Sequence, residues 1–163
     1  MNYNSINKKS YQAIAKSYAE RDRKKITETT DVENALKRFV KLLPQKARVL
    51  DLGCGAGRDS QYFIKNNVQI IGIDFSPKMI FYAKKLNPQG IFHIMDFEKL
   101  KFKKSKFDGV WANASLHHIP KSHLLNVLKN INKILKKKRG FIFKSKTRSQ
   151  RRSLKRYKIW SFD

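Results

Sequence analysis

The stretch Arg48-Val-Leu-Asp-Leu-Gly-Cys-Gly-Ala-Gly-Arg-Asp59 decides the fold. Its apolar first half surrounds one acid, Asp51, and glycines then follow at positions 53, 55 and 57. This pattern is typical of a buried parallel strand that ends in a loop passing close to a ligand, because glycine accepts a positive φ and carries no Cβ. The polar residues after the third glycine open a helix, whose N-terminal amides favour negative charge.

Further apolar runs alternate with helical patterns along the chain. We expect strands at about 68–74, 91–95 and 107–112, and a fifth strand that begins at Phe141. Ser76-Pro77 is a helix start, and the last helix is expected to close at residues 136–140. The pattern predicts an α/β fold: a Rossmann-like, doubly wound and mainly parallel sheet of about five strands, with helices on both faces.

Composition limits the class of protein. The chain has 163 residues, one cysteine and a net charge of +25. That length corresponds to one domain, and the single cysteine excludes an intrachain disulfide framework. We expect no metal site, because His and Cys lack metal-ligand spacing, and no membrane span, since no apolar run approaches about 20 residues. The start lacks the apolar core of a signal peptide, so the expected location is the cytoplasm.

Acids close successive strands of the predicted sheet. Asp51 lies in the first strand, Asp74 ends the second and Asp96 follows the third. Because ligands bind beyond the carboxyl ends of parallel strands, these acids are candidate site residues. Asp74 lies 17 residues after Gly57, and a carboxylate there suits a ribose diol, since it accepts two hydroxyl protons. The sequence therefore predicts a nucleoside ligand.

The glycine spacing distinguishes between nucleosides. A dinucleotide loop needs G-x-G-x-x-G, whereas here Arg58 follows the third glycine directly. The segment 51–57 instead resembles motif I of the class I S-adenosylmethionine-dependent methyltransferases. Ile71-Gly-Ile-Asp-Phe-Ser-Pro-Lys-Met-Ile80, His93-Ile-Met-Asp-Phe97 and Phe107-Asp-Gly-Val-Trp-Ala-Asn-Ala-Ser-Leu-His-His-Ile-Pro120 resemble later motifs of that family, in order. The resemblance covers about residues 10–145.

The resemblance implies a set of residues that bind the cofactor S-adenosyl-L-methionine. The glycine loop would pass beneath its methionine part, Asp51 would position the ammonium group, and Asp74 would hold the ribose. Asp96 would accept from the adenine amino group. The whole implied set is Asp51, Gly53, Cys54, Gly55, Gly57, Asp74, Phe75, Met79, Asp96, Phe97, Asn113 and, from an N-terminal helix that closes over the site, Tyr11 and Tyr18.

Five of the candidate side chains have a second interpretation. His117 and His118 follow the fourth strand, where either could take a proton from an acceptor, or could pack within the loop. Tyr11 and Tyr18 either gate the site or are core residues of an amphipathic helix. Cys54 is expected to serve close packing in the loop rather than nucleophilic catalysis, because transfer from a sulfonium needs no enzyme nucleophile.

The C-terminal part departs from the family pattern. A complete fold of this kind has seven strands, the last two forming an antiparallel hairpin, and we expect those strands to be missing. Residues 144–158 hold eight Lys or Arg and no acid. We therefore divide the chain into an N-terminal lid (1–30), a methyltransferase domain (31–146) and a basic, disordered tail (147–163). A truncated reading frame, a degenerate paralogue and a genuine basic arm are three explanations.

The leading hypothesis is a methyltransferase that acts on a small molecule, with activity reduced by the truncation. One alternative is an RNA or tRNA methyltransferase that binds through the basic tail, since +25 favours polyanions. The other interpretation of that charge is a solvated lysine-rich surface. The remaining alternative is a remnant that binds the cofactor without turnover.

Overall fold

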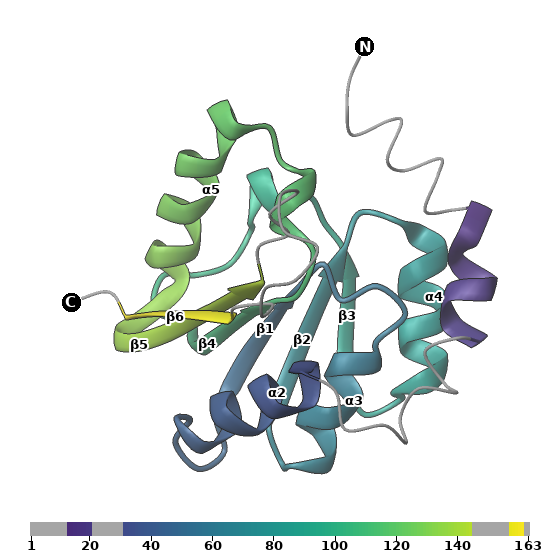
Figure 1. The fold of residues 1–163 in the computed structure, drawn as a ribbon, viewed down its shortest axis with the longest axis horizontal. Helices are drawn as coiled ribbons and strands as arrows, with labels where there is room; N and C mark the ends of the chain where they lie inside the picture. Colours follow the sequence, from purple (N-terminus) through teal and green to yellow (C-terminus); the bar gives the residue numbers. More distant parts are fainter. Residues whose placement is uncertain (1–12, 21–30, 145–156, 162–163) are drawn as a thin grey trace.

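The computed structural model of the chain describes residues 13–20, 31–144 and 157–161. Figure 1 shows a sheet with helices packed around it. The strands are β1 (Arg48–Leu52), β2 (Gln69–Asp74), β3 (Ile91–Ile94), β4 (Phe107–Ala112), β5 (Leu135–Lys144) and β6 (Tyr157–Ser161). The labelled helices are α2 (Asp31–Lys41), α3 (Arg58–Lys65), α4 (Pro77–Leu86) and α5 (Lys121–Ile134), with short 3-10 turns η2 (Phe97–Lys99) and η3 (Leu116–His118). A further helix spans residues 13–20.

The sheet has the strand order β3-β2-β1-β4-β5-β6. The first five strands are parallel, as predicted, and the order reverses between β1 and β4. The ligand site of such a sheet lies at this switch point, beyond the carboxyl ends of the strands.

A sixth strand extends the sheet beyond the five that were expected. β6 pairs antiparallel with β5, with Trp160 opposite Phe141. It lies in the segment 147–163 that the sequence pattern assigned to a tail, and residues 147–156 and 162–163 of that segment lie outside the described residues. The aromatic and β-branched residues of Tyr157-Lys-Ile-Trp160 have high strand propensity, which the surrounding positive charge obscured.

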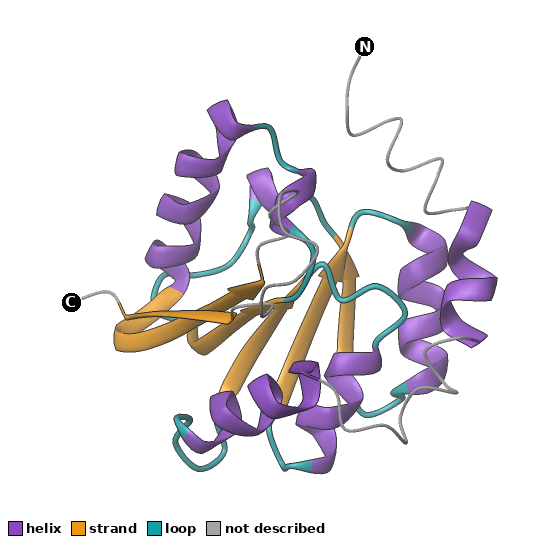
Figure 2. Cartoon of the chain, viewed as in Figure 1, coloured by secondary structure: helices purple, strands orange, loops and turns teal. Residues whose placement is uncertain are grey.

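Alternate side chains of the strands enter two different cores. Leu50 and Leu52 of β1 point to the face covered by α5, where they join Val127 and Ile131 in one cluster. Val49 points to the opposite face, into a cluster with residues of α2 and α3. Figure 2 shows α5 on one side and α2 and α3 on the other. Successive side chains of a strand point to opposite faces of the sheet, so a parallel strand that is covered on both faces contributes to both cores.

The boundary between α5 and β5 differs from the expected one. The helix ends at Ile134 and the strand begins at Leu135, so that residues 136–140 belong to β5 rather than to the end of the helix. Leu135 is buried and pairs with Phe107 of β4, and the Lys136 Nζ lies 2.9 Å from a carboxylate oxygen of the buried Asp108. These tertiary contacts outweigh the high helix propensity of a lysine run.

Candidate functional site

A pocket opens beyond the carboxyl ends of β1, β2 and β4. Its volume is about 430 Å³, part of which is open to solvent. Its wall comes from five segments far apart in the sequence: the helix at 13–20, the glycine loop, the β2–α4 junction, the segment after β3 and the segment after β4. The lining residues are Tyr18, Gly53, Gly55, Asp74, Phe75, Met79, Phe97, Asn113, Ala114 and Ser115.

The glycine loop is tied to the neighbouring strand by its backbone. The N–H groups of Gly53 and Cys54 both donate to the Ile73 carbonyl, at 2.8 and 2.9 Å. Gly55 has φ +54°, and a Cβ added there would meet no atom within 4 Å. Gly55 therefore presents bare backbone to the pocket, and a side chain at this position would take up space that a ligand can use.

The third glycine serves helix packing rather than the lining of the pocket. Gly57 does not line the pocket; it has φ +87°, and an added Cβ would lie 2.5 Å from the Asn87 Nδ2. The same Asn87 nitrogen donates to the Gly57 carbonyl at 2.8 Å. Gly57 thus lets the start of α3 pack closely against the end of α4, and this packing fixes the loop from behind.

Asp74 is the acid at the pocket wall. Its Oδ2 accepts from the Gly55 N–H at 3.1 Å, and its Oδ1 accepts from the Ser76 N–H at 2.8 Å. Burial raises the pKa of Asp74 to about 6, against the lowering effect of these backbone donors. A carboxylate has about four acceptor sites, so Asp74 can bind the loop and still accept from ligand hydroxyls.

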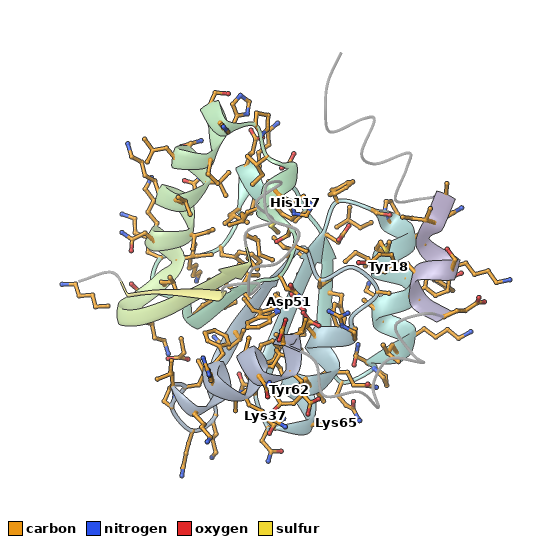
Figure 3. All side chains as sticks on the ribbon, in the orientation of Figure 1. Tyr18, Lys37, Asp51, Tyr62, Lys65 and His117 are labelled. Atoms are coloured by element: carbon orange, nitrogen blue, oxygen red, sulfur yellow. The ribbon has the colours of Figure 1, made fainter. Side chains whose placement is uncertain are left out.

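Asp51 lies beneath the pocket rather than in its wall. Its side chain is buried near the centre of the fold (Figure 3), where its Oδ2 accepts from the Ser60 Oγ at 2.6 Å. Burial, together with the charge of Asp59, raises the pKa of Asp51 to about 8. The structure therefore places Asp51 in a buried pair of acids under the glycine loop, and not among the lining residues.

Asp59 joins three parts of the site, a role that the sequence pattern did not reveal. Its Oδ2 accepts from the Trp111 Nε1 at 2.9 Å and from the Asn113 Nδ2 at 2.8 Å. Its Oδ1 accepts from the Arg58 Nε at 2.8 Å. The sequence does contain an indication of it, because Trp111 lies in a strand predicted to be buried, and a buried indole N–H needs an acceptor.

The segment after β4 completes the wall on the other side. Ala114 has φ +56°, a left-handed conformation that is uncommon for alanine. Ser115 was not predicted; its Oγ is buried and has no hydrogen-bond partner within the described residues. A Cβ on Gly53 would lie 2.5 Å from the Ser115 Cβ, so this glycine is required by the close approach of the two segments.

The N-terminal helix and the β2–α4 junction supply the apolar part of the wall. Tyr18 reaches the pocket from residues 13–20, and Ala15 of the same helix packs with Ala56 and Met79. Phe75 and Phe97 meet edge to face, with ring centroids 6.4 Å apart. Tyr11 lies outside the described residues.

Several predicted residues do not reach the pocket. Cys54 packs with Ile80, Ala83 and Phe92, and burial raises the pKa of its thiol well above the ordinary value, which suits a packing role. Asp96 caps η2, where its Oδ1 accepts from the Glu98 N–H at 3.0 Å. His117 is exposed on η3 and is not a lining residue, and the side chain of His118 is not described.

The part of the chain that the structure describes contains neither a metal-ligand cluster nor a membrane-spanning helix. No group of three or more His, Cys, Asp or Glu side chains among the described residues could hold a metal ion. None of the helices in this part of the chain has the length and apolar character needed to cross a membrane.

Comparison with known families matches the central part of the chain. The family model described as a methyltransferase domain matches residues 49–138. This range runs from β1 into β5, so it includes the glycine loop, Asp74 and the segment after β4.

Individual relatives agree with this match. An uncharacterized methyltransferase of Synechocystis is 32% identical over 89 residues, which are 55% of this chain and 42% of the relative. The 27-O-demethylrifamycin SV methyltransferase of Amycolatopsis mediterranei is 34% identical over 92 residues, 51% of this chain and 34% of the relative. The chain thus spans less than half the length of these two relatives.

A solved structure extends the likeness to most of the described fold. The TehB-like SAM-dependent methyltransferase of Corynebacterium glutamicum superimposes with a TM-score of 0.71 at 25% identity. The superposition covers 80% of this chain and 72% of that protein.

Proposed function

The chain belongs to the methyltransferase-domain family of class I S-adenosylmethionine-dependent methyltransferases, and we propose that it transfers a methyl group from S-adenosylmethionine to a small-molecule acceptor. The observation that carries this proposal is the pairing of Gly55 with Asp74. A bare backbone turn and a buried carboxylate, joined at 3.1 Å, face one pocket.

The residues present fit the cofactor. At Gly55 a Cβ would meet nothing within 4 Å, so the loop leaves room for a ligand beside its backbone. Asp74 offers acceptor sites for a ribose diol, and Phe75, Met79 and Phe97 offer an apolar wall for a purine ring. A nucleoside site needs an acid that accepts from the ribose hydroxyls and an apolar or aromatic surface that packs against the base, and this pocket has both.

When bound, S-adenosylmethionine supplies a sulfonium methyl group that is ready for transfer. The chain's own residues then bind the cofactor and orient it for the transfer. In this proposal Asp74 holds the ribose, Phe97 and the neighbouring Asp96 lie at the adenine end, and Asn113 lies beside the methyl position. Asp51 lies beneath the loop, where the positive charge of the ligand would favour the ionised form of this buried acid.

In this proposal the rate enhancement comes from alignment of the methyl group with the acceptor atom and from exclusion of water. Tyr18, carried by the helix at 13–20, covers the pocket from the side of α4 (Figure 3). No enzyme nucleophile is needed, which agrees with the packed, protonated thiol of Cys54. His117, a candidate base from the sequence, lies on η3 outside the lining of the pocket, so it has no role in proton transfer in this proposal.

The choice of a small-molecule acceptor rests on two observations. The pocket is lined by residues from five segments of the chain, which suits a compact substrate. The Amycolatopsis relative is named for a small-molecule substrate, 27-O-demethylrifamycin SV.

Isothermal titration of the full chain with S-adenosylmethionine and S-adenosylhomocysteine tests the first half of the proposal. Both ligands are expected to bind at one site. Absence of binding by folded protein would refute the cofactor assignment. Transfer of a labelled methyl group to a panel of small acceptors tests the second half, and binding without transfer to any of them would favour the remnant that retains only the cofactor site.

A further inference from the structure

Between residues 31 and 144 the positive charge is distributed unevenly along the chain. Residues 31–98 hold 10 Lys or Arg and 7 Asp or Glu, a net charge of +3. Residues 99–144 hold 13 Lys or Arg and one acid, a net charge of +12 in a shorter segment. A uniformly lysine-rich composition would not produce this asymmetry, so the segment needs a local explanation.

Two backbone hydrogen bonds bring the cations of this segment together. The loop between η2 and β4 reaches the C-terminal end of α5 (Figure 2), where the Ser105 N–H donates to the Lys133 carbonyl at 3.1 Å. The Lys106 N–H donates to the Ile134 carbonyl at 2.8 Å. Loop, helix end and the start of β5 thus form one continuous region. We call it the α5 surface and define it by six exposed lysines: Lys101, Lys103, Lys104, Lys129, Lys133 and Lys137.

The nearby acids do not neutralise this surface. Asp108 is buried and is held by the Lys136 Nζ, at 2.9 and 3.1 Å, and by the Arg48 N–H. Glu98 pairs with His123 at 3.1 Å. Within the described residues, none of the six lysines forms an ion pair with an acid, so their charges add into one positive field.

We propose that the α5 surface binds the phosphate backbone of a nucleic-acid duplex without regard to sequence. Lysines present point charges, which suit phosphates and do not distinguish base edges. Phe102 offers no exposed platform for base stacking, because it is half-buried and the Lys106 Nζ lies 5.0 Å from its ring centroid.

A nucleic acid fits this surface better than an acidic protein does. Protein interfaces centre on aromatic and apolar anchors and are depleted in lysine. The single large apolar side chain exposed on α5 is Leu125, one turn before Lys129. One leucine at the margin is too little apolar area for the centre of a protein interface.

The α5 surface is separate from the candidate active site. It lies where β4 and β5 begin, whereas the pocket lies beyond the carboxyl end of β4. The six residues of β4 between them span about 20 Å. The inference is therefore independent of the proposed methyl transfer, and binding of the duplex is expected with and without S-adenosylhomocysteine.

Fluorescence anisotropy with a labelled RNA duplex of about 20 base pairs tests the proposal on the full chain. If about five phosphates are contacted, the slope of log K against log salt is roughly −4 to −5. Changing Lys103, Lys104, Lys129 and Lys133 to Gln is expected to weaken binding at least tenfold and to reduce the slope by about 3. Thermal melts establish that each variant is folded.

A charge-matched variant supplies the control. Changing Lys65, Lys78, Lys84 and Lys85 to Gln removes the same four charges from exposed positions on α3 and α4, and is expected to change affinity less than threefold. Equal losses in the two variants would overturn the proposal, since binding would then follow net charge alone. It would also be overturned if polyglutamate or phosphatidylserine vesicles displaced the duplex at equal charge concentration.

Discussion

Asp59 and Asn113 lie 54 residues apart in the chain, and a hydrogen bond of 2.8 Å joins the Asn113 Nδ2 to the Asp59 Oδ2. Because the same oxygen accepts from the Trp111 Nε1, the start of α3 is fixed to the end of β4. Asn113 lines the pocket, so Asp59 acts on the site by holding one of its walls.

Replacing Asp59 by Asn is expected to lower the free energy of unfolding by about 2 kcal/mol. The amide is neutral and turns its own N–H₂ group toward one of the donors, so a buried charge-assisted bond is lost. Urea unfolding measures the change. Asp31→Asn, at an exposed acid of α2, is the control and should cost less than about 0.5 kcal/mol. Equal costs for the two variants would contradict the role given to Asp59.

Asp74→Asn is expected to weaken the binding of S-adenosylhomocysteine by about 2–3 kcal/mol, roughly 30- to 150-fold. The physical reason is the loss of a carboxylate that accepts from two ribose hydroxyls. Isothermal titration measures the affinity, and circular dichroism establishes that the variant is folded.

A ligand control makes the assignment of Asp74 specific. An analogue of S-adenosylhomocysteine without the ribose hydroxyls should bind the wild-type chain weakly, and the Asp74→Asn variant with little further loss. If the analogue and the variant produce additive losses, the carboxylate contacts another part of the ligand.

The succession of β1 to β4 along the chain and their parallel arrangement were predicted from pattern alone. Apolar runs that end in Asp51 and Asp74 indicate buried parallel strands, and topology then brings their ends together. Ser76 caps α4 as predicted, with its Oγ accepting from the Met79 N–H at 3.4 Å. These features depend on residues that are close in the sequence, and interactions between such residues can be predicted from a single sequence.

The features that were missed depend on contacts between distant residues. The Asp59–Trp111 bond joins residues 52 positions apart, so the sequence pattern of α3 alone or of β4 alone does not indicate it. Ser115 enters the pocket wall because Ala114 adopts φ +56°, which no propensity of alanine predicts. The early start of β5 depends on Lys136 meeting Asp108, 28 residues before it.

Substitutions of Gly55 and Gly57 are expected to affect different properties of the chain, mainly cofactor affinity at Gly55 and mainly the free energy of unfolding at Gly57. An alanine at either position adopts a positive φ at a cost of about 1–2 kcal/mol. At Gly57 the added Cβ also lies 2.5 Å from the Asn87 Nδ2 and 3.1 Å from the Ala83 Cα, which adds about 1–3 kcal/mol. Urea unfolding should therefore show Gly57→Ala as the less stable variant.

Cofactor affinity should rank the same two variants in the opposite order. The Cβ of Gly55→Ala stands in the pocket, so S-adenosylhomocysteine should bind it about tenfold more weakly, a loss of about 1.4 kcal/mol. Gly57→Ala should keep its affinity once the folded fraction is taken into account. The same ranking in both measurements would refute the separate tasks given to the two glycines.

The pKa of Asp51 makes stability depend on pH with a defined sign. In the folded chain this pKa is raised to about 8 from an ordinary value of 3.8, so the folded state keeps a proton that the unfolded state loses. The free energy of unfolding therefore falls as pH rises from about 4 to about 8, by up to about 1.4 kcal/mol per pH unit. Asp74, with a pKa raised to about 6, adds to the fall between about pH 4 and 6.

Asp51→Asn removes the titrating group and keeps its shape and its acceptor for the Ser60 hydroxyl. At about pH 5 the wild type has lost only the first part of this stability, so its difference from the variant should be smaller than at higher pH. At about pH 7.5 the advantage of the variant should be larger by at least about 1 kcal/mol, because the loss that comes from Asp51 occurs only in the wild type, whereas the loss from Asp74 occurs in both proteins. Urea unfolding of both proteins at the two pH values measures this difference. A constant difference between them would mean that Asp51 is ionised throughout this pH range in the folded chain, which would contradict its raised pKa.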